Sequence, residues 1–124
     1  MYAIEIVGDL SAEHMPIFLD LAAQYGRECG YVLVLVNCLR AGTMHPEARR
    51  LAIAFRKHST ARSATAIAGA GLATRTVATL LFKAMALVTG KESAVSFFKH
   101  ESEARLWLDE RRPQMLASAA GRKR

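Results

Sequence analysis

The sequence predicts an α/β fold with a mainly parallel four-stranded sheet, in which strands and helices alternate in the order βαβαβαβα. Two observations carry this prediction. The segment Tyr31–Asn37 is apolar without alternation up to its last residue, which is typical of a strand covered on both faces. Strand-like segments also alternate with helical patterns through short connections, which favours a parallel sheet with right-handed crossovers.

The chain has 124 residues, of which 52% are hydrophobic, and this suffices for one domain with a sizeable core. We expect the domain to cover residues 1–112 and a mobile basic tail to cover 113–124, because Pro113 should stop the last helix. A signal peptide is not predicted, because Glu5 and Asp9 lie where its basic and then apolar segments would be. The two cysteines form no CxxC pair. A reduced cytoplasmic protein is the simplest interpretation.

The net charge of +6 is unevenly distributed. Residues 1–48 carry six acidic and two basic side chains, a net charge of −4, whereas residues 49–124 carry fifteen basic and five acidic ones, a net charge of +10. This asymmetry is compatible with an acidic partner, an anionic membrane surface or nucleic acid, and equally with a solvated basic face. Nucleic acid is disfavoured because no recognition motif and no interleaved aromatic residues accompany the bases.

The first strand is predicted at residues 2–7, followed by a turn at Gly8–Leu10. Ser11 is a suitable N-cap for the next helix, whose apolar residues recur at helical spacing and which ends near Gly30. Pro16 removes one backbone hydrogen bond, so we expect this helix to begin late or irregularly.

A loop is predicted at residues 38–45, and Pro46 suits the first position of the second helix, one face of which is basic. Residues 64–68 form the third strand, whose small side chains indicate that another element packs close over it. The last strand is predicted at residues 94–98, and the last helix at residues 101–111.

The third helix, predicted at residues 73–88, is apolar nearly all round. A four-stranded domain cannot surround such a helix, so part of its surface should be left for a dimer, a ligand or a lipid. We do not expect it to be transmembrane, because it is shorter than the ~20 residues that a bilayer needs. In addition, the central Lys83 offsets the gain from inserting its apolar side chains.

The chain resembles the STAS superfamily, in particular its SpoIIAA-like (STAS/SEC14-like) branch. Four stretches carry the resemblance: VGDLS at residues 7–11, the strand ending at Asn37, AGAGLATR at 68–75, and the pair Phe97-Phe98 followed by EARLWL at 103–108. The resemblance implies a (βα) superhelix with its helices largely on one side of the sheet. It also implies one more N-terminal strand, which is absent or reduced here.

Members of the anti-sigma-factor antagonist branch carry a phosphorylated serine just after the strand that matches Tyr31–Asn37. No hydroxyl occupies the matched position in this chain, where the sequence is MHPEA at residues 44–48. Glu47 is either a helix-start residue or a constitutive stand-in for the phosphate, since a negative charge is stabilised at a helix N-terminus. Thr43 is the nearest hydroxyl.

The glycine-rich turn between the third strand and the third helix has two interpretations. Gly69, Gly71, Thr74 and Arg75 would present backbone N–H groups and a guanidinium to an anion or a phosphate-bearing ligand. The alternative is a tight turn with an N-cap at Thr74. A dinucleotide site is disfavoured because the third glycine of the fingerprint is Thr74 and the turn does not follow the first strand.

No metal site and no cofactor are predicted, because the four histidines are scattered. Cys38 with His45 in the same loop is the weak basis for a hydrolase, but no signature surrounds the pair, and a core or rim thiol is the better interpretation. We therefore predict no catalytic residues.

The first functional hypothesis is a non-enzymatic regulatory or signalling module that binds a protein partner. It would dock through residues 39–46 and the start of the second helix, and the third helix would support a homodimer or the partner contact. Its predicted partner-binding residues are Asn37, Thr43, His45, Glu47 and Arg50.

The alternative hypothesis is a small-molecule or lipid-binding protein of SEC14-like type. Its apolar pocket would be walled by the third helix, and Gly69, Gly71, Thr74 and Arg75 would hold a polar or phosphate head group.

Overall fold

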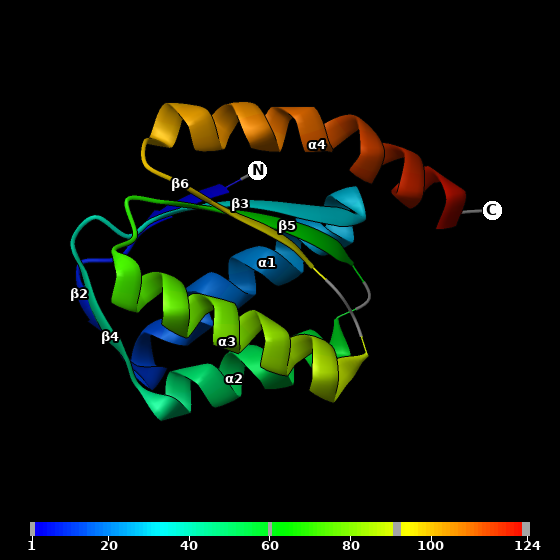
Figure 1. Cartoon of the computed structure of the whole chain (residues 1–124). Helices are drawn as coiled ribbons and strands as arrows, with labels where there is room; N and C mark the ends of the chain where they lie inside the picture. The colour runs from blue at the N-terminus through cyan, green and yellow to red at the C-terminus, as the bar shows by residue number, and fades with distance from the viewer. Residues whose placement is uncertain (1, 60, 91–92, 123–124) are drawn as a thin grey trace.

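The main sheet of the protein is parallel and four-stranded (Figure 1). The structure is a computed structural model that describes residues 2–59, 61–90 and 93–122. Its strands lie in the order β1 (Tyr2–Glu5), β3 (Tyr31–Asn37), β5 (Arg62–Ala68) and β6 (Ala94–Phe98). The predicted α/β class with a mainly parallel four-stranded sheet is confirmed. Because spatial order follows chain order, each crossover advances the sheet by one strand in the same direction.

Strand β3 is interior, as predicted. It pairs with β1 on one side and with β5 on the other, and its five central residues are all buried. Leu33 and Leu35 point to one face of the sheet, and Val32, Val34 and Val36 belong to the core on the other face. The unbroken apolar run therefore reflects burial on both faces.

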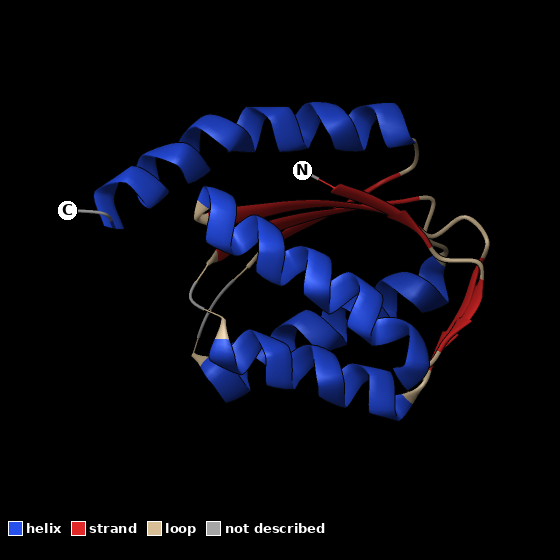
Figure 2. Ribbon diagram, turned by 180° about the vertical axis from the view of Figure 1, so that it is seen from behind, coloured by secondary structure: helices blue, strands red, loops and turns tan. Residues whose placement is uncertain are grey.

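Among the described residues, three helices lie on one face of the sheet and α4 (Glu101–Arg122) lies on the other (Figures 1 and 2). The three are α1 (Met15–Cys29), α2 (Pro46–His58) and α3 (Leu72–Thr89). Right-handed crossovers that always advance in one direction place their helices on the same face. Helix α4 follows the last strand, makes no crossover and folds back over the open face.

Helix α2 lies outside α1 and α3, in a second layer below the sheet (Figure 1). A sheet of four strands measures roughly 14 Å between its outer strands, which two helices about 10 Å apart cover. Helices α1 and α3 take these positions, with Ala22 and Tyr25 of α1 and Ala78 and Phe82 of α3 packed against the core. Consequently α2 packs chiefly on the two helices.

The opposite face of the sheet packs against α4. Ala64, Ala66 and Ala68 of β5 are buried together with Ala104 and Leu108 of α4. The small side chains of β5 let this helix approach closely, which confirms that an element packs over the alanine-rich strand.

The expected end of the last helix at Pro113 is wrong, because α4 continues through this proline to Arg122. A proline inside a helix costs about 3 kcal/mol. However, Met115 is buried in the core in line with Ala104 and Leu108, and this packing offsets part of the cost. The mobility expected of residues 113–124 stays a prediction, and residues 123 and 124 lie outside the described part of the chain.

The expected turn at Gly8–Leu10 and the expected loop at 38–45 are also wrong in part. Strands β2 (Gly8–Leu10) and β4 (Ala41–Met44) pair in parallel as a second, smaller sheet. The chain leaves β1 and β3 side by side, and backbone hydrogen bonds continue from Ile6 N to Asn37 O (3.0 Å) and from Gly8 N to Arg40 O (2.9 Å). The pairing thus extends beyond the carboxyl end of the main sheet.

The helix boundaries largely follow the predicted signals. Gly30 ends α1 in the left-handed conformation (φ 77°), and α2 begins at Pro46. Ser11 precedes a short 3-10 helix, η1 (Ala12–His14), so α1 begins only at Met15, which confirms the late start expected from Pro16.

We predict that Leu35→Ala lowers the free energy of unfolding by about 2–5 kcal/mol, because it leaves a cavity in the centre of the sheet. Leu106→Ala on α4 is the matched control. It removes the same atoms from a side chain that is 64% exposed, and it should change stability by no more than about 0.5 kcal/mol. Urea unfolding of both variants measures the difference, and equal losses would contradict the interior position of β3.

Candidate functional site

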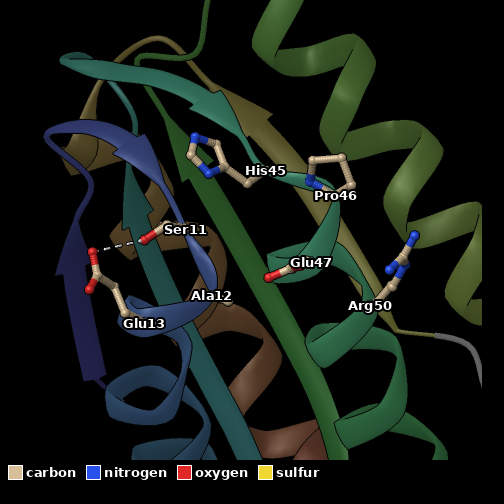
Figure 3. Close-up of a pocket in the computed structure, with 7 residues that line it drawn as sticks. All are labelled: Ser11, Ala12, Glu13, His45, Pro46, Glu47 and Arg50. Atoms are coloured by element: carbon tan, nitrogen blue, oxygen red, sulfur yellow. Dashed lines mark hydrogen bonds between the residues drawn. The ribbon is translucent and has the colours of Figure 1, made fainter.

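A cleft of about 550 Å³ opens between η1 and the start of α2 (Figure 3). It contains three of the five predicted partner-binding residues, His45, Glu47 and Arg50. The residues that line it are Ser11, Ala12, Glu13, His45, Pro46, Glu47 and Arg50. The structure therefore brings the predicted segment together with a wall about 30 residues earlier in the chain, which the sequence analysis did not predict.

The η1 wall is held by short-range hydrogen bonds. The backbone N–H of Ser11 donates to Nδ1 of His14 (3.2 Å), and the Ser11 hydroxyl donates to Oε1 of Glu13 (3.4 Å). These bonds satisfy a backbone donor at the start of the helical turn. Glu13 is among the residues that line the cleft, and its carboxylate turns back towards Ser11, on the side of η1 away from Glu47 (Figure 3).

The α2 wall is positioned by the small sheet. The backbone N–H of His45 donates to the carbonyl oxygen of Leu10 (2.8 Å), which continues the pairing of β2 with β4 up to the helix. His45 is extended (φ −68°, ψ 147°), as the following proline requires. Glu47 then lies in the first turn of α2, where the helix dipole stabilises its carboxylate.

Asp9 connects the two strands of the small sheet. Its Oδ1 accepts a hydrogen bond from the backbone N–H of Thr43 (2.8 Å), and its Oδ2 lies 3.9 Å from Nε2 of His45. The hydrogen bond from Thr43 is the main cause that lowers the pKa of Asp9 below its ordinary value. Gly42 makes this approach feasible, because a Cβ atom there would meet the Asp9 carboxylate and the backbone of Gly8.

Two of the predicted partner-binding residues do not line the cleft. Thr43 contributes its backbone to the small sheet, as described above. The Asn37 side chain accepts a hydrogen bond from the backbone N–H of Leu39 (3.0 Å) and so forms the turn that ends β3. Both residues shape the segment that carries His45.

The four residues of the predicted anion site lie at the junction of β5 and α3. Gly69 has a positive φ of 75°, and a Cβ there would come within 3.2–3.3 Å of Leu39. Gly71 caps α3, so the N-cap expected at Thr74 is wrong, and Thr74 lies in the first turn of the helix. The Arg75 guanidinium lies 5.5 Å from the centre of the Phe97 ring. None of the four lines the cleft at η1 or the groove described next.

A second, more apolar groove of about 540 Å³ separates α1 from α2, and the sequence analysis did not predict it. Its lining includes Leu19, Ala22, Ala23, Gly26, Leu51 and Phe55. The signal that could have revealed it is the run of small residues on α1. At Gly26 a Cβ would come within 3.1 Å of Ala61.

The weak basis for a hydrolase, Cys38 with His45, is not brought together as a reactive pair in the described residues. Cys38 is buried, and burial raises the pKa of its thiol, which disfavours the nucleophilic thiolate. No hydrogen bond joins Cys38 to His45 in the described residues. Within the same residues, no cluster of three or more His, Cys, Asp or Glu side chains is suited to a metal ion.

The lowered pKa of Asp9 predicts a pH dependence of stability. Its carboxylate contributes stability above the unfolded pKa of about 3.9, and this contribution is lost as the pH falls through the lower folded pKa. Asp9→Asn should therefore lower the melting temperature at pH 7 and have no effect at a pH below the folded pKa. Asp20→Asn, at an exposed aspartate on α1, is the control. An equal effect of Asp9→Asn at both pH values would contradict the prediction.

The chain was compared with protein-family models, with curated proteins and with solved structures. No family model, no curated protein and no solved structure matches it. Membership of the STAS superfamily thus remains a prediction from the four sequence stretches.

Proposed function

We propose that the protein is a non-enzymatic regulatory module of the STAS-like, SpoIIAA-like type that binds a protein partner through the cleft between η1 and α2. The observation that carries this proposal is the gathering of charged side chains of both signs, Glu13, Glu47 and Arg50, around one opening. Charge patterns of this kind determine partner choice and orientation at protein interfaces.

The form of the cleft supports a protein segment as the ligand. His45, Pro46, Glu47 and Arg50 are all exposed. Sites for small molecules usually bury 70–90% of the ligand among largely apolar side chains. An open depression with a charged rim suits a partner that brings its own surface to cover it.

Glu47 has a specific role in this proposal. When the chain is matched to the anti-sigma-factor antagonists that it resembles, residues 44–48 fall at the position of their phosphorylated serine. Glu47 lies in the first turn of α2, next to the cleft. Its carboxylate would present a permanent negative charge where those relatives present a switchable one.

The test of the proposal first identifies the partner and then measures how charge reversal changes its binding. A photo-crosslinking amino acid placed at Ala12 should capture the partner in cells of the native host, and mass spectrometry then identifies it. With the purified partner, Glu47→Lys combined with Arg50→Glu should weaken binding at least tenfold, measured by calorimetry.

The matched control is Glu101→Lys combined with Arg105→Glu, which reverses an exposed pair (3.4 Å) on α4, across the sheet from the cleft. This variant should bind as the original protein does. Equal weakening by both double variants, or by neither, would contradict docking at the cleft.

The alternative hypothesis of an enclosed lipid or small-molecule pocket stays a prediction. Several apolar side chains of α3 face solvent, and Arg75 packs over Phe97. These observations do not favour a pocket walled by α3, so the cleft at η1 is our primary site. The homodimer and the cytoplasmic location likewise stay predictions.

A further inference from the structure

The groove between α1 and α2 has two ends that can be distinguished from the course of the helices. The segment η1, which leads into α1, faces the start of α2 across the cleft. Gly26, near the end of α1, lies next to Ala61, just beyond the end of α2. The two helices therefore run side by side in the same direction, and their last turns meet at one end of the groove.

The two ends of the groove differ in chemistry. Leu19 and Leu51, from earlier turns of the two helices, line one end. Arg27 in the last turn of α1 and His58, the last residue of α2, line the other. No acidic side chain is among the described residues that line the groove. This arrangement is complementary to a molecule with an apolar body and one anionic group.

The packing of α2 explains why the groove is open. From its second layer α2 packs more extensively on α3 than on α1. The walls carry small side chains at Ala23 and Ala54, which do not fill the space that is left. Ala22 and Ala61 on the floor pack against the core under the sheet. A hydrocarbon chain in the groove would thus contact both walls and the edge of the core, and its burial there is favourable.

The cationic end has donors available for an anion. The side chains of Arg27 and His58 are exposed. Neither side chain forms a hydrogen bond or an ion pair with another residue in the part of the chain that the structure describes. A guanidinium carries several N–H donors, and a neutral imidazole carries one, so the two side chains can donate to a carboxylate.

The ends of two helices also bring negative partial charge to this place. The carbonyl oxygen of Gly26 accepts a hydrogen bond from the backbone N–H of Gly30 (3.0 Å). The carbonyl oxygen of Ala61 accepts one from Nη1 of Arg56 (2.8 Å). These bonds offset part of the negative charge. Because the cationic side chains are exposed, the polar contact should be weak, and apolar contact should supply most of the affinity.

We infer that this groove binds an amphipathic carboxylate of the medium-chain fatty acid type. Its carboxylate contacts Arg27 and His58, and its hydrocarbon chain lies between Ala23 and Ala54 and points towards Leu51. From residue 19 to residue 27 the helix is about 12 Å long, comparable with an extended chain of about ten carbon atoms. The volume of about 540 Å³ is ordinary for a small-molecule site. The groove and the cleft at η1 share no lining residue, so this inference does not rest on the proposed function.

Calorimetric titration of the full chain with decanoate, and separately with decanol, tests the inference. One decanoate should bind per chain, and it should shift the amide NMR signals of Ala23 and Ala54. Arg27→Gln should weaken decanoate binding about fivefold, the effect of an exposed ion pair, and leave decanol binding unchanged. Ala54→Phe should weaken the binding of both probes about tenfold, because the ring occupies the place of the hydrocarbon chain.

The matched controls are Arg49→Gln and Ala73→Phe, at exposed positions that do not line the groove. Both should bind decanoate as the original protein does, and all variants should keep its melting temperature. Absence of decanoate binding, or an unchanged affinity in Ala54→Phe, would overturn the inference. Equal weakening by Arg27→Gln and Arg49→Gln would also overturn it, because general charge attraction would then explain the binding.

Discussion

The burial of β3 on both faces is the constraint on which the rest of the structure depends. Leu33 and Leu35 pack towards α4, and the valines between and beside them pack towards α1 and α3. A strand in this position needs a partner strand on each side and a helix layer on each face. The direction of the crossovers then places three of the described helices below the sheet, so that, in the part of the chain that the structure describes, α4 alone remains for the upper face.

This arrangement also determines where the surfaces arise. In parallel sheets, ligands bind beyond the carboxyl ends of the strands. Here the chain leaving β1 and β3 pairs once more as β2 and β4, and that small sheet carries His45 and Pro46 to the wall opposite η1. A four-stranded sheet is too narrow for three helices to pack directly on one of its faces. As a result α2 lies in a second layer and part of α3 stays uncovered. The cleft and the uncovered part of α3 thus have a common origin in the strand order.

Features with a strong local signal could be predicted from the sequence. The apolar run at Tyr31–Asn37, Gly30 after α1 and Pro46 at the start of α2 each determine their own conformation, and the structure confirms them. Features determined by tertiary contacts could not be predicted from the sequence. The short polar strands β2 and β4 pair only because their parent strands are neighbours, and α4 passes Pro113 because Met115 is buried beyond it. His45 and Arg50 could be predicted as binding residues because they follow the central strand in sequence. The η1 wall of the cleft could not, because the folded structure alone brings it next to them.

Native-state hydrogen exchange of the β3 amides, followed by NMR, tests the central claim most directly. If β3 is the interior strand, the amides of residues 32–36 exchange only through global unfolding. Their opening free energy then equals the stability measured by denaturant. The account predicts this equality for Val34 and Leu35, with lower values for residues 2–5 of the edge strand β1. Exchange of Val34 and Leu35 through a local opening well below the global free energy would contradict it.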